Sequence, residues 1–308
     1  MMLLSLVVWA GSLLFMLGAL AKIVRYARMP MHVRWELYPV PHEKGKSDHG
    51  GSFLEDVDWW TKPIPKSKAG ELKAMGEEII LLKGVFESNK PLWTWTLPFH
   101  LGLYLLVCLV GLLLVGAIAE LALGHSLSNG SGFWQLIHNL TALVAWAGLL
   151  ASALGTLGLL VRRLTDPKLK GYTPPAAILN LLFMLVLFCV GIFARLTVDQ
   201  NGALLREAVA GILTFSQPTQ TVPNLIFVEM ILFSAFVAYL PFTFMSHMYM
   251  KFFTYHSVRW DDHPRRPGDP TDPRLMEYLK YPVSWSAKHV KKDKHETWAD
   301  VVLDQEAD

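Results

Sequence analysis

Five long stretches of the sequence carry almost no charged residues, and they constrain the fold more than any other feature. They run from Leu3 to Leu20, Trp95 to Leu121, Phe133 to Val161, Ala176 to Ala194 and Leu225 to Met250. Each has roughly the 20 residues that a helix needs to cross about 30 Å of hydrocarbon. Lipid offers no partner to backbone N–H and C=O groups, so each stretch should be helical. The sequence therefore predicts an all-α integral membrane protein, a bundle of five transmembrane helices.

The basic residues are placed unevenly along the chain, and their placement predicts the orientation. Twelve Lys and Arg lie between residues 22 and 90, four between 162 and 170, and ten after residue 250. These 26 of the 28 fall on one side of the predicted membrane, and Arg195 and Arg206 fall on the other. By the positive-inside rule, the basic loops and the C-terminus are cytoplasmic and the N-terminus lies outside. We expect a multi-pass protein of the cytoplasmic (inner) membrane.

Two parts are predicted along the chain. Residues 1–255 would form the membrane domain, including a long cytoplasmic loop over residues 22–91, and residues 256–308 would form a cytoplasmic tail. The tail is too polar to enter lipid, yet Trp285 and Trp298 give it hydrophobic anchors. A segment with too few apolar residues for its own core either orders on a partner or stays solvated. We favour a partner-binding tail.

The second half of the loop has apolar residues at steps of three or four, namely Leu72, Met75, Ile79, Leu82 and Phe86. This spacing predicts one amphipathic helix. Such a helix lies on the membrane surface or packs against a partner subunit. The adjacent Glu77 and Glu78 favour the partner.

The two cysteines, Cys108 and Cys189, both lie within apolar stretches, where we expect buried and inert thiols. The sequence contains no CxxC or CxxCH motif. Such motifs are typical of iron–sulfur ligation and of covalent haem attachment. An iron–sulfur cluster bound by this chain itself is therefore not expected.

Three of the eleven histidines fall within the apolar stretches: His100, His138 and His247. An imidazole in hydrocarbon is costly without a partner and therefore indicates function. His100 and His247 each lie about 21 residues from the outer end of their helices, which is about 31 Å at 1.5 Å per residue. Two imidazoles at one depth on antiparallel helices can bind the two faces of a haem b. The alternatives are a zinc site, which would need more ligands, and hydrogen-bonded structural histidines.

A second group of ionisable residues is expected near the outer face. His138 and Glu229 each lie about five residues inside their predicted helices, and Arg195 lies near the outer edge. Ionisable groups at this depth would suit a site where a quinol docks and loses protons. Two alternatives stay open: His138 ligates a second haem, or a hydrogen bond between Glu229 and His138 joins two helices.

At these residues the chain resembles a known family. The segments "PFHLGLY" and "PFTFMSH", around His100 and His247, resemble the cytochrome b (gamma) subunit of respiratory nitrate reductase. The segments "SHMYMKFFTYHSVRWDD" and "WSAKHVKKDKHETWADVV" make the chain more similar to one group of its relatives. These are the cytochrome b subunits of sulfite-reduction-associated, heterodisulfide-reductase-like menaquinone-linked membrane complexes.

The resemblance implies a function for the histidines. In the nitrate reductase family, the second span carries two haem-ligand histidines ten residues apart and the fifth span carries two that are eighteen apart. His100 and His247 match the inner pair, whereas Val110 and Glu229 stand at the outer positions. The resemblance thus implies one haem b. A second haem would need other ligands, with His138 as one candidate. Its partner would be Met230 or His125.

The resemblance also implies an electron relay in dissimilatory sulfur metabolism. Menaquinol would be oxidised near the outer face, and electrons would pass through haem b to a cytoplasmic iron–sulfur subunit of a heterodisulfide-reductase-like type. Further membrane subunits and an outer-face cytochrome c or iron–sulfur subunit would complete the complex. The chain would act as a subunit of an oxidoreductase, in contact with membrane lipid and without nucleic acid.

Two rival functions are weighed against this relay. The first is a non-redox membrane anchor that recruits the cytoplasmic partner. The second is a transporter, which the lack of an inverted repeat and the few intramembrane charges disfavour.

Overall fold

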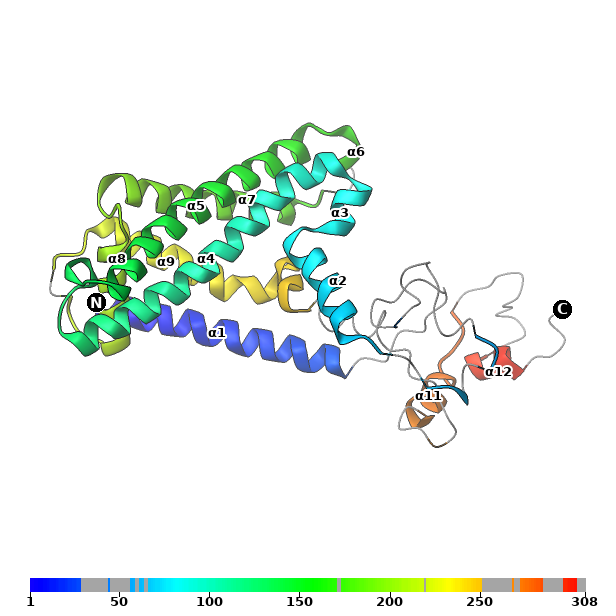
Figure 1. Cartoon of the computed structure of the whole chain (residues 1–308). Coiled ribbons are helices and arrows are strands. Elements are labelled where there is room, and N and C mark those ends of the chain that lie inside the picture. Colours follow the sequence, from blue (N-terminus) through cyan, green and yellow to red (C-terminus); the bar gives the residue numbers. More distant parts are fainter. Residues whose placement is uncertain are drawn as a thin grey trace. The chain divides into compact units, whose positions relative to one another are not determined.

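The structure is a computed structural model and describes residues 1–28, 44, 56–58, 61–63, 66–170, 173–218, 220–250, 268, 272–284 and 296–303. The chain divides into two compact units. Unit 1 comprises Met1–Arg25 and Lys68–Met250, and unit 2 comprises Tyr26–Ser67 and Lys251–Asp308. Each unit is described by itself (Figure 1).

Unit 1 is built of helices, and none of its described residues belongs to a β-strand. In chain order they are α1 (Met2–Ala27), α2 (Lys68–Ile80), α3 (Lys83–Ser88), α4 (Lys90–Leu123), η3 (Leu127–Asn129), α5 (Phe133–Thr165), α6 (Pro167–Lys170), α7 (Pro175–Thr197), α8 (Ala203–Thr214), α9 (Asn224–Tyr239), η4 (Leu240–Phe242) and η5 (Phe244–Ser246). Five of these are long and apolar enough to cross a membrane: α1, α4, α5, α7 and α9 with η4. The prediction of five spanning helices is confirmed, and the chain is a multi-pass membrane protein.

The five spans define two ends of the bundle. The basic end is where α1, α5 and α9 finish and where α4 and α7 begin, and it carries Lys22, Lys90 and Arg162. The α8 end carries the opposite termini of these helices together with α8. α1 and α9 run in parallel, because Val7 and Lys22 of α1 bond to Ser234 and Thr243 respectively. Figure 1 shows these two helices side by side.

Small residues let the two longest helices, α4 and α5, approach closely. An added Cβ at Gly155 of α5 would collide with the backbone of Phe99, and one at Gly102 of α4 would collide with Ser152. Gly158 meets the Trp95 ring in the same way. In lipid, helices gain little from excluding water, so close van der Waals contact of this kind is what holds them together. We call this contact the glycine seam.

The last span departs from the prediction of one helix to Met250. The α-helix ends at Tyr239, and Pro241 lies in the short 3₁₀ turn η4. Thr243 then has an extended backbone, with φ −108° and ψ 171°, before η5 and one further helical turn at residues 247–250. Proline lacks the N–H that would continue the ladder of hydrogen bonds, which accounts for the interruption at this point.

The predicted amphipathic helix of the cytoplasmic loop is two helices instead of one. α2 and α3 are separated at Leu82, which is buried and has a left-handed backbone with φ 52°. Glu78 accepts a hydrogen bond from Gly84 N (2.9 Å), and Lys83 pairs with Glu77 at 2.7 Å. The hydrogen bond and charge of Lys83 lower the pKa of Glu77. The two glutamates therefore stabilise this turn.

The cysteine prediction is wrong in one respect. Cys108 and Cys189 are both exposed on the surface of the bundle rather than buried in it. Their apolar neighbours in the sequence indicate a membrane span, and in a span the outer face is as apolar as the core.

Unit 2 has local structure of its own in its described residues. α11 (Asp272–Tyr278) and α12 (Trp298–Leu303) are joined by backbone hydrogen bonds from Ala299 N to Leu279 O (2.8 Å) and from Trp298 N to Tyr281 O (3.1 Å). Val283 is 3% exposed. These described residues of the tail thus form a small folded element, which the polar composition did not indicate. The predicted anchor Trp285 lies outside the described residues.

We expect the glycine seam to be necessary for stability. Gly155→Val would force side-chain atoms into the Phe99 backbone, and overpacking of this kind costs about 1–3 kcal/mol. The melting temperature in detergent, followed by tryptophan fluorescence, should fall. The control is Gly111→Val on α4, because a side chain added there meets no atom within 4 Å. Equal melting temperatures for the two variants would contradict the role of the seam.

Candidate functional site

The structure places His100 of α4 beside His247, which follows η5, at the basic end. Their ring centroids are 6.1 Å apart, and the ring planes are inclined by 51°. His100 Nδ1 lies 2.8 Å from Thr96 O, and His247 Nδ1 lies 3.0 Å from Phe244 O. A carbonyl oxygen only accepts hydrogen bonds, so each Nδ1 carries the proton and each Nε2 carries the lone pair. Both rings are therefore in the tautomer that binds a metal through Nε2.

The two rings are close neighbours, because a centroid separation of 6.1 Å lies within the range of about 4.5–7 Å found for rings in contact. Within the described residues no three or more His, Cys, Asp or Glu gather into a metal site. Among these described residues the zinc alternative therefore finds no ligand set, whereas a cofactor held by two histidines would need no further ligand.

The turn between α2 and α3 is attached to α4 close to the histidine pair. Tyr104, whose ring centroid is 6.3 Å from that of His100, donates a hydrogen bond from its hydroxyl to Ile79 O at 2.9 Å. Trp93 Nε1 donates to Leu81 O at 2.7 Å. These two bonds hold the loop segment along the first turns of α4, on the side where His100 lies.

At the α8 end, one buried guanidinium contacts two carboxylates. Arg195 is 1% exposed, and its Nη2 lies 2.8 Å from Glu229 Oε2 and 3.3 Å from Asp199 Oδ2. The Asp199 carboxylate also accepts hydrogen bonds from the backbone N–H groups of Leu204 and Leu205, both at 3.0 Å, at the start of α8. Arg195 and Glu229 thus meet as the sequence led us to expect. Asp199 was missed, although its position four residues after Arg195 is a pairing signal in a helix.

His138 lies in a second polar cluster at this end. Its Nδ1 is 3.3 Å from Nη2 of the fully buried Arg206, and Arg206 Nε donates to Glu120 Oε1 at 2.9 Å. Glu120 Oε1 also accepts from Leu127 N at 2.8 Å. The alternative of a hydrogen bond between His138 and Glu229 is not what the structure shows, since His138 contacts Arg206. Glu120 and Arg206 were both missed, although they are isolated charged residues in apolar surroundings.

The contact with Arg206 bears on the idea that His138 ligates a second haem. A guanidinium can only donate, so Nδ1 of His138 must accept and Nε2 carries the proton. That is the opposite of the tautomer seen at His100 and His247. Met230 and His125 are the two candidates for the other ligand of that second haem. His125 is exposed after α4, and Met230 is buried in α9. The geometry favours a hydrogen-bonding role for His138.

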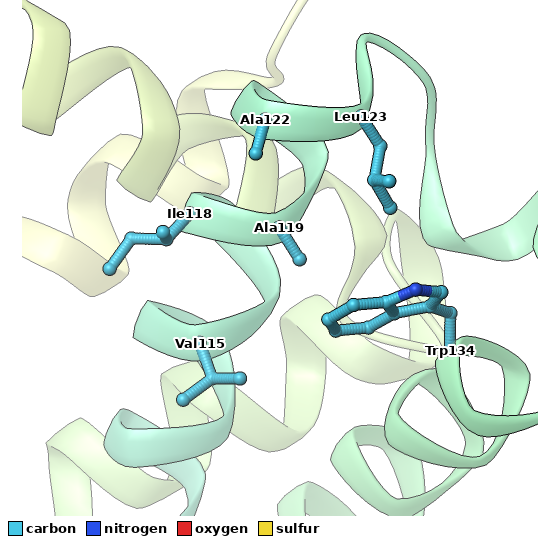
Figure 2. A pocket seen from close by; sticks show the side chains of 6 residues that line it. All are labelled: Val115, Ile118, Ala119, Ala122, Leu123 and Trp134. Atoms are coloured by element: carbon cyan, nitrogen blue, oxygen red, sulfur yellow. The ribbon is translucent and has the colours of Figure 1, made fainter.

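An apolar pocket of about 340 Å³ lies at the α8 end of α4 (Figure 2). It is lined by Val115, Ile118, Ala119, Ala122, Leu123 and Trp134. Figure 2 shows the Trp134 ring of α5 facing Ala119 of α4. Ala119 precedes Glu120, and Trp134 is one helical turn before His138. The pocket therefore lies beside the elements that carry the second polar cluster.

Comparison with known proteins identifies no relative, since no protein-family model, curated protein or solved structure matches the chain significantly.

The pairing of Arg206 with Glu120 predicts a specific pattern of stability. Arg206→Met leaves a carboxylate of low exposure without its cation, and breaking a buried ion pair in this way costs about 3–5 kcal/mol. The double variant Arg206→Met with Glu120→Gln removes both charges and should recover part of that loss. Melting temperatures of the two variants and of Glu120→Gln alone test this. A double variant no more stable than Arg206→Met would argue against the pairing.

Proposed function

We propose that the chain is the haem b membrane subunit of a quinone-linked oxidoreductase, which passes electrons between menaquinol and a cytoplasmic iron–sulfur subunit. The His100–His247 pair is the observation that carries this proposal. His100 and His247, with ring centroids 6.1 Å apart, would hold a haem b between them through their Nε2 atoms. When bound, haem supplies reversible one-electron chemistry that side chains do not offer.

The distribution of charge supports a position of the His100–His247 pair near the cytoplasmic face. By the positive-inside rule, the basic end is cytoplasmic and the α8 end is outside. The histidine pair then lies on the side of the long loop and the tail. These segments would receive the iron–sulfur subunit of heterodisulfide-reductase-like type that the sequence resemblance implies. The resemblance also suggests sulfur metabolism as the setting, in the cytoplasmic membrane.

The Arg195 cluster supports proton exchange at the outer end. Two carboxylates share one guanidinium, so full ionisation would leave an excess negative charge in a region of low polarity. The Asp199 carboxylate is already occupied by two backbone N–H bonds, whereas among the described residues Glu229 contacts only the guanidinium. Glu229 is therefore the carboxyl that would take up and release a proton. Oxidation of a quinol releases protons, and Glu229 is suited to accept one.

The approach of menaquinol is proposed at the same end. Its ring and isoprenoid chain are apolar, and the pocket beside Trp134 has an apolar lining. His138, one turn further along α5, would offer its Nε2–H to a quinone oxygen. We propose one haem, because the tautomer of His138 suits hydrogen bonding better than iron ligation.

The haem proposal predicts a spectral signature. A pyridine haemochrome of protein purified from haem-replete cells should show b-type haem, and His100→Ala and His247→Ala should each abolish the same low-spin component. His125→Ala is the matched control, because His125 is exposed and lies at the other end of α4. A full low-spin signal in either ligand variant would refute the pair. A wild-type protein without b-type haem would favour the non-redox anchor.

The proton-acceptor role predicts a kinetic effect. Glu229→Gln keeps the shape of the side chain but removes the base, and general bases typically contribute about 10²–10⁴-fold to a rate. Haem reduction by a menaquinol analogue should slow by about 100-fold, whereas reduction by dithionite should be unchanged. Equal rates with the menaquinol analogue would show that Glu229 only joins helices.

A further inference from the structure

The interruption of the last span exposes backbone groups that a continuous helix would satisfy internally. Thr243 has an extended backbone between η4 and η5, and both Thr243 and Ser246 are buried, at 7% and 5% exposure. A carbonyl left without a hydrogen bond at this depth costs free energy. Within the segment itself, Thr243 O accepts a long hydrogen bond from Ser246 N, at 3.4 Å.

Lys22 of α1 adds hydrogen bonds to this segment from another helix. Its ammonium donates to Thr243 O at 3.3 Å and to Ser246 Oγ at 2.7 Å. The Ser246 hydroxyl in turn donates to Thr243 O at 2.8 Å. A lysine at the end of a span ordinarily extends toward the lipid headgroups. Here its Nζ is directed at the interruption instead.

The packing of α1 brings Lys22 to this place. Gly18, one turn before Lys22, lies against Pro241, where an added Cβ would be 2.9 Å from the proline Cβ. Gly11 meets Ser234 at a still closer approach. α1 therefore follows the last span closely, and the lysine reaches the point where the α-helix has ended.

His247 depends on the same few residues. It directly follows Ser246, and its Nδ1 bonds to Phe244 O of η5. We propose that Lys22 is a positioning residue: by fixing the segment from Thr243 to Ser246, it sets His247 against His100. The proposal rests on the proposed function for its haem readout. It gives α1 a role in the site although α1 contributes no ligand.

The test compares Lys22→Met and Lys22→Arg in the full-length protein. Lys22→Met should speed amide hydrogen exchange in residues 240–250 by about tenfold, because the segment opens more readily, and should leave α9 unchanged. In the same sample, the midpoint potential and low-spin electron paramagnetic resonance of the haem should shift, since ligand orientation tunes both. Lys22→Arg should restore both, because a guanidinium also donates to a carbonyl oxygen.

Arg25→Met is the matched control, since it removes an exposed cation one turn further along the same helix. The double variant Ser246→Ala with Lys22→Met should change the exchange rates and the midpoint potential by less than the sum of the two single variants, because both residues belong to one hydrogen-bond network. Faster exchange with an unaltered haem signal would overturn the positioning role, and so would unchanged exchange. Absence of haem from the wild type would reject the proposed function instead, and the exchange rates would still decide whether Lys22 holds the segment.

Discussion

A polar group that leaves water must find its partner inside the protein, and both ends of this bundle are built around that requirement. At the basic end, the last span is interrupted at Thr243, and Lys22 adds a hydrogen bond to Thr243 O beside the bonds from Ser246. At the α8 end, Arg206 is fully buried and bonds to Glu120 and His138. In each case a side chain from a distant part of the sequence satisfies the group, so the same bonds that lower the cost of burial also fix the helices relative to each other.

The two ends are chemically different, and this difference organises the proposed function. The histidine pair has both lone pairs on Nε2, which suits a metal centre. The other end holds carboxylates and guanidiniums, which suit proton exchange. Along α4, twenty residues separate His100 from Glu120, or about 30 Å at 1.5 Å per residue. The single helix α4 thus carries His100 at the basic end and Glu120 of the Arg206 cluster at the α8 end.

Much of this arrangement could be predicted from the sequence, because hydrocarbon imposes strict rules. The five spans follow from length and charge, and the placement of His100 and His247 at the same end follows from their positions near the same ends of two antiparallel spans. The clusters around Asp199 and Arg206 could not be predicted in full, because the contacts between side chains of three or four helices depend on how those helices pack. His138 is an example. Its depth in the membrane predicted a position near Glu229, but the direction in which its side chain leaves the helix brings it to Arg206. The end of the helix at Tyr239 depends on Pro241 and on the support that α1 offers there.

The glycine seam has a mechanical consequence. Backbones in direct contact, as at Gly155 and Phe99, leave no layer of side chains that could slide or repack between α4 and α5. Alternating access requires one part of a bundle to rock against another. α4, the helix that bears His100, instead packs in close contact with α5 over several turns. Such packing opposes the relative motion that a transporter needs. It suits a protein in which the distance between the two ends of α4 must stay constant.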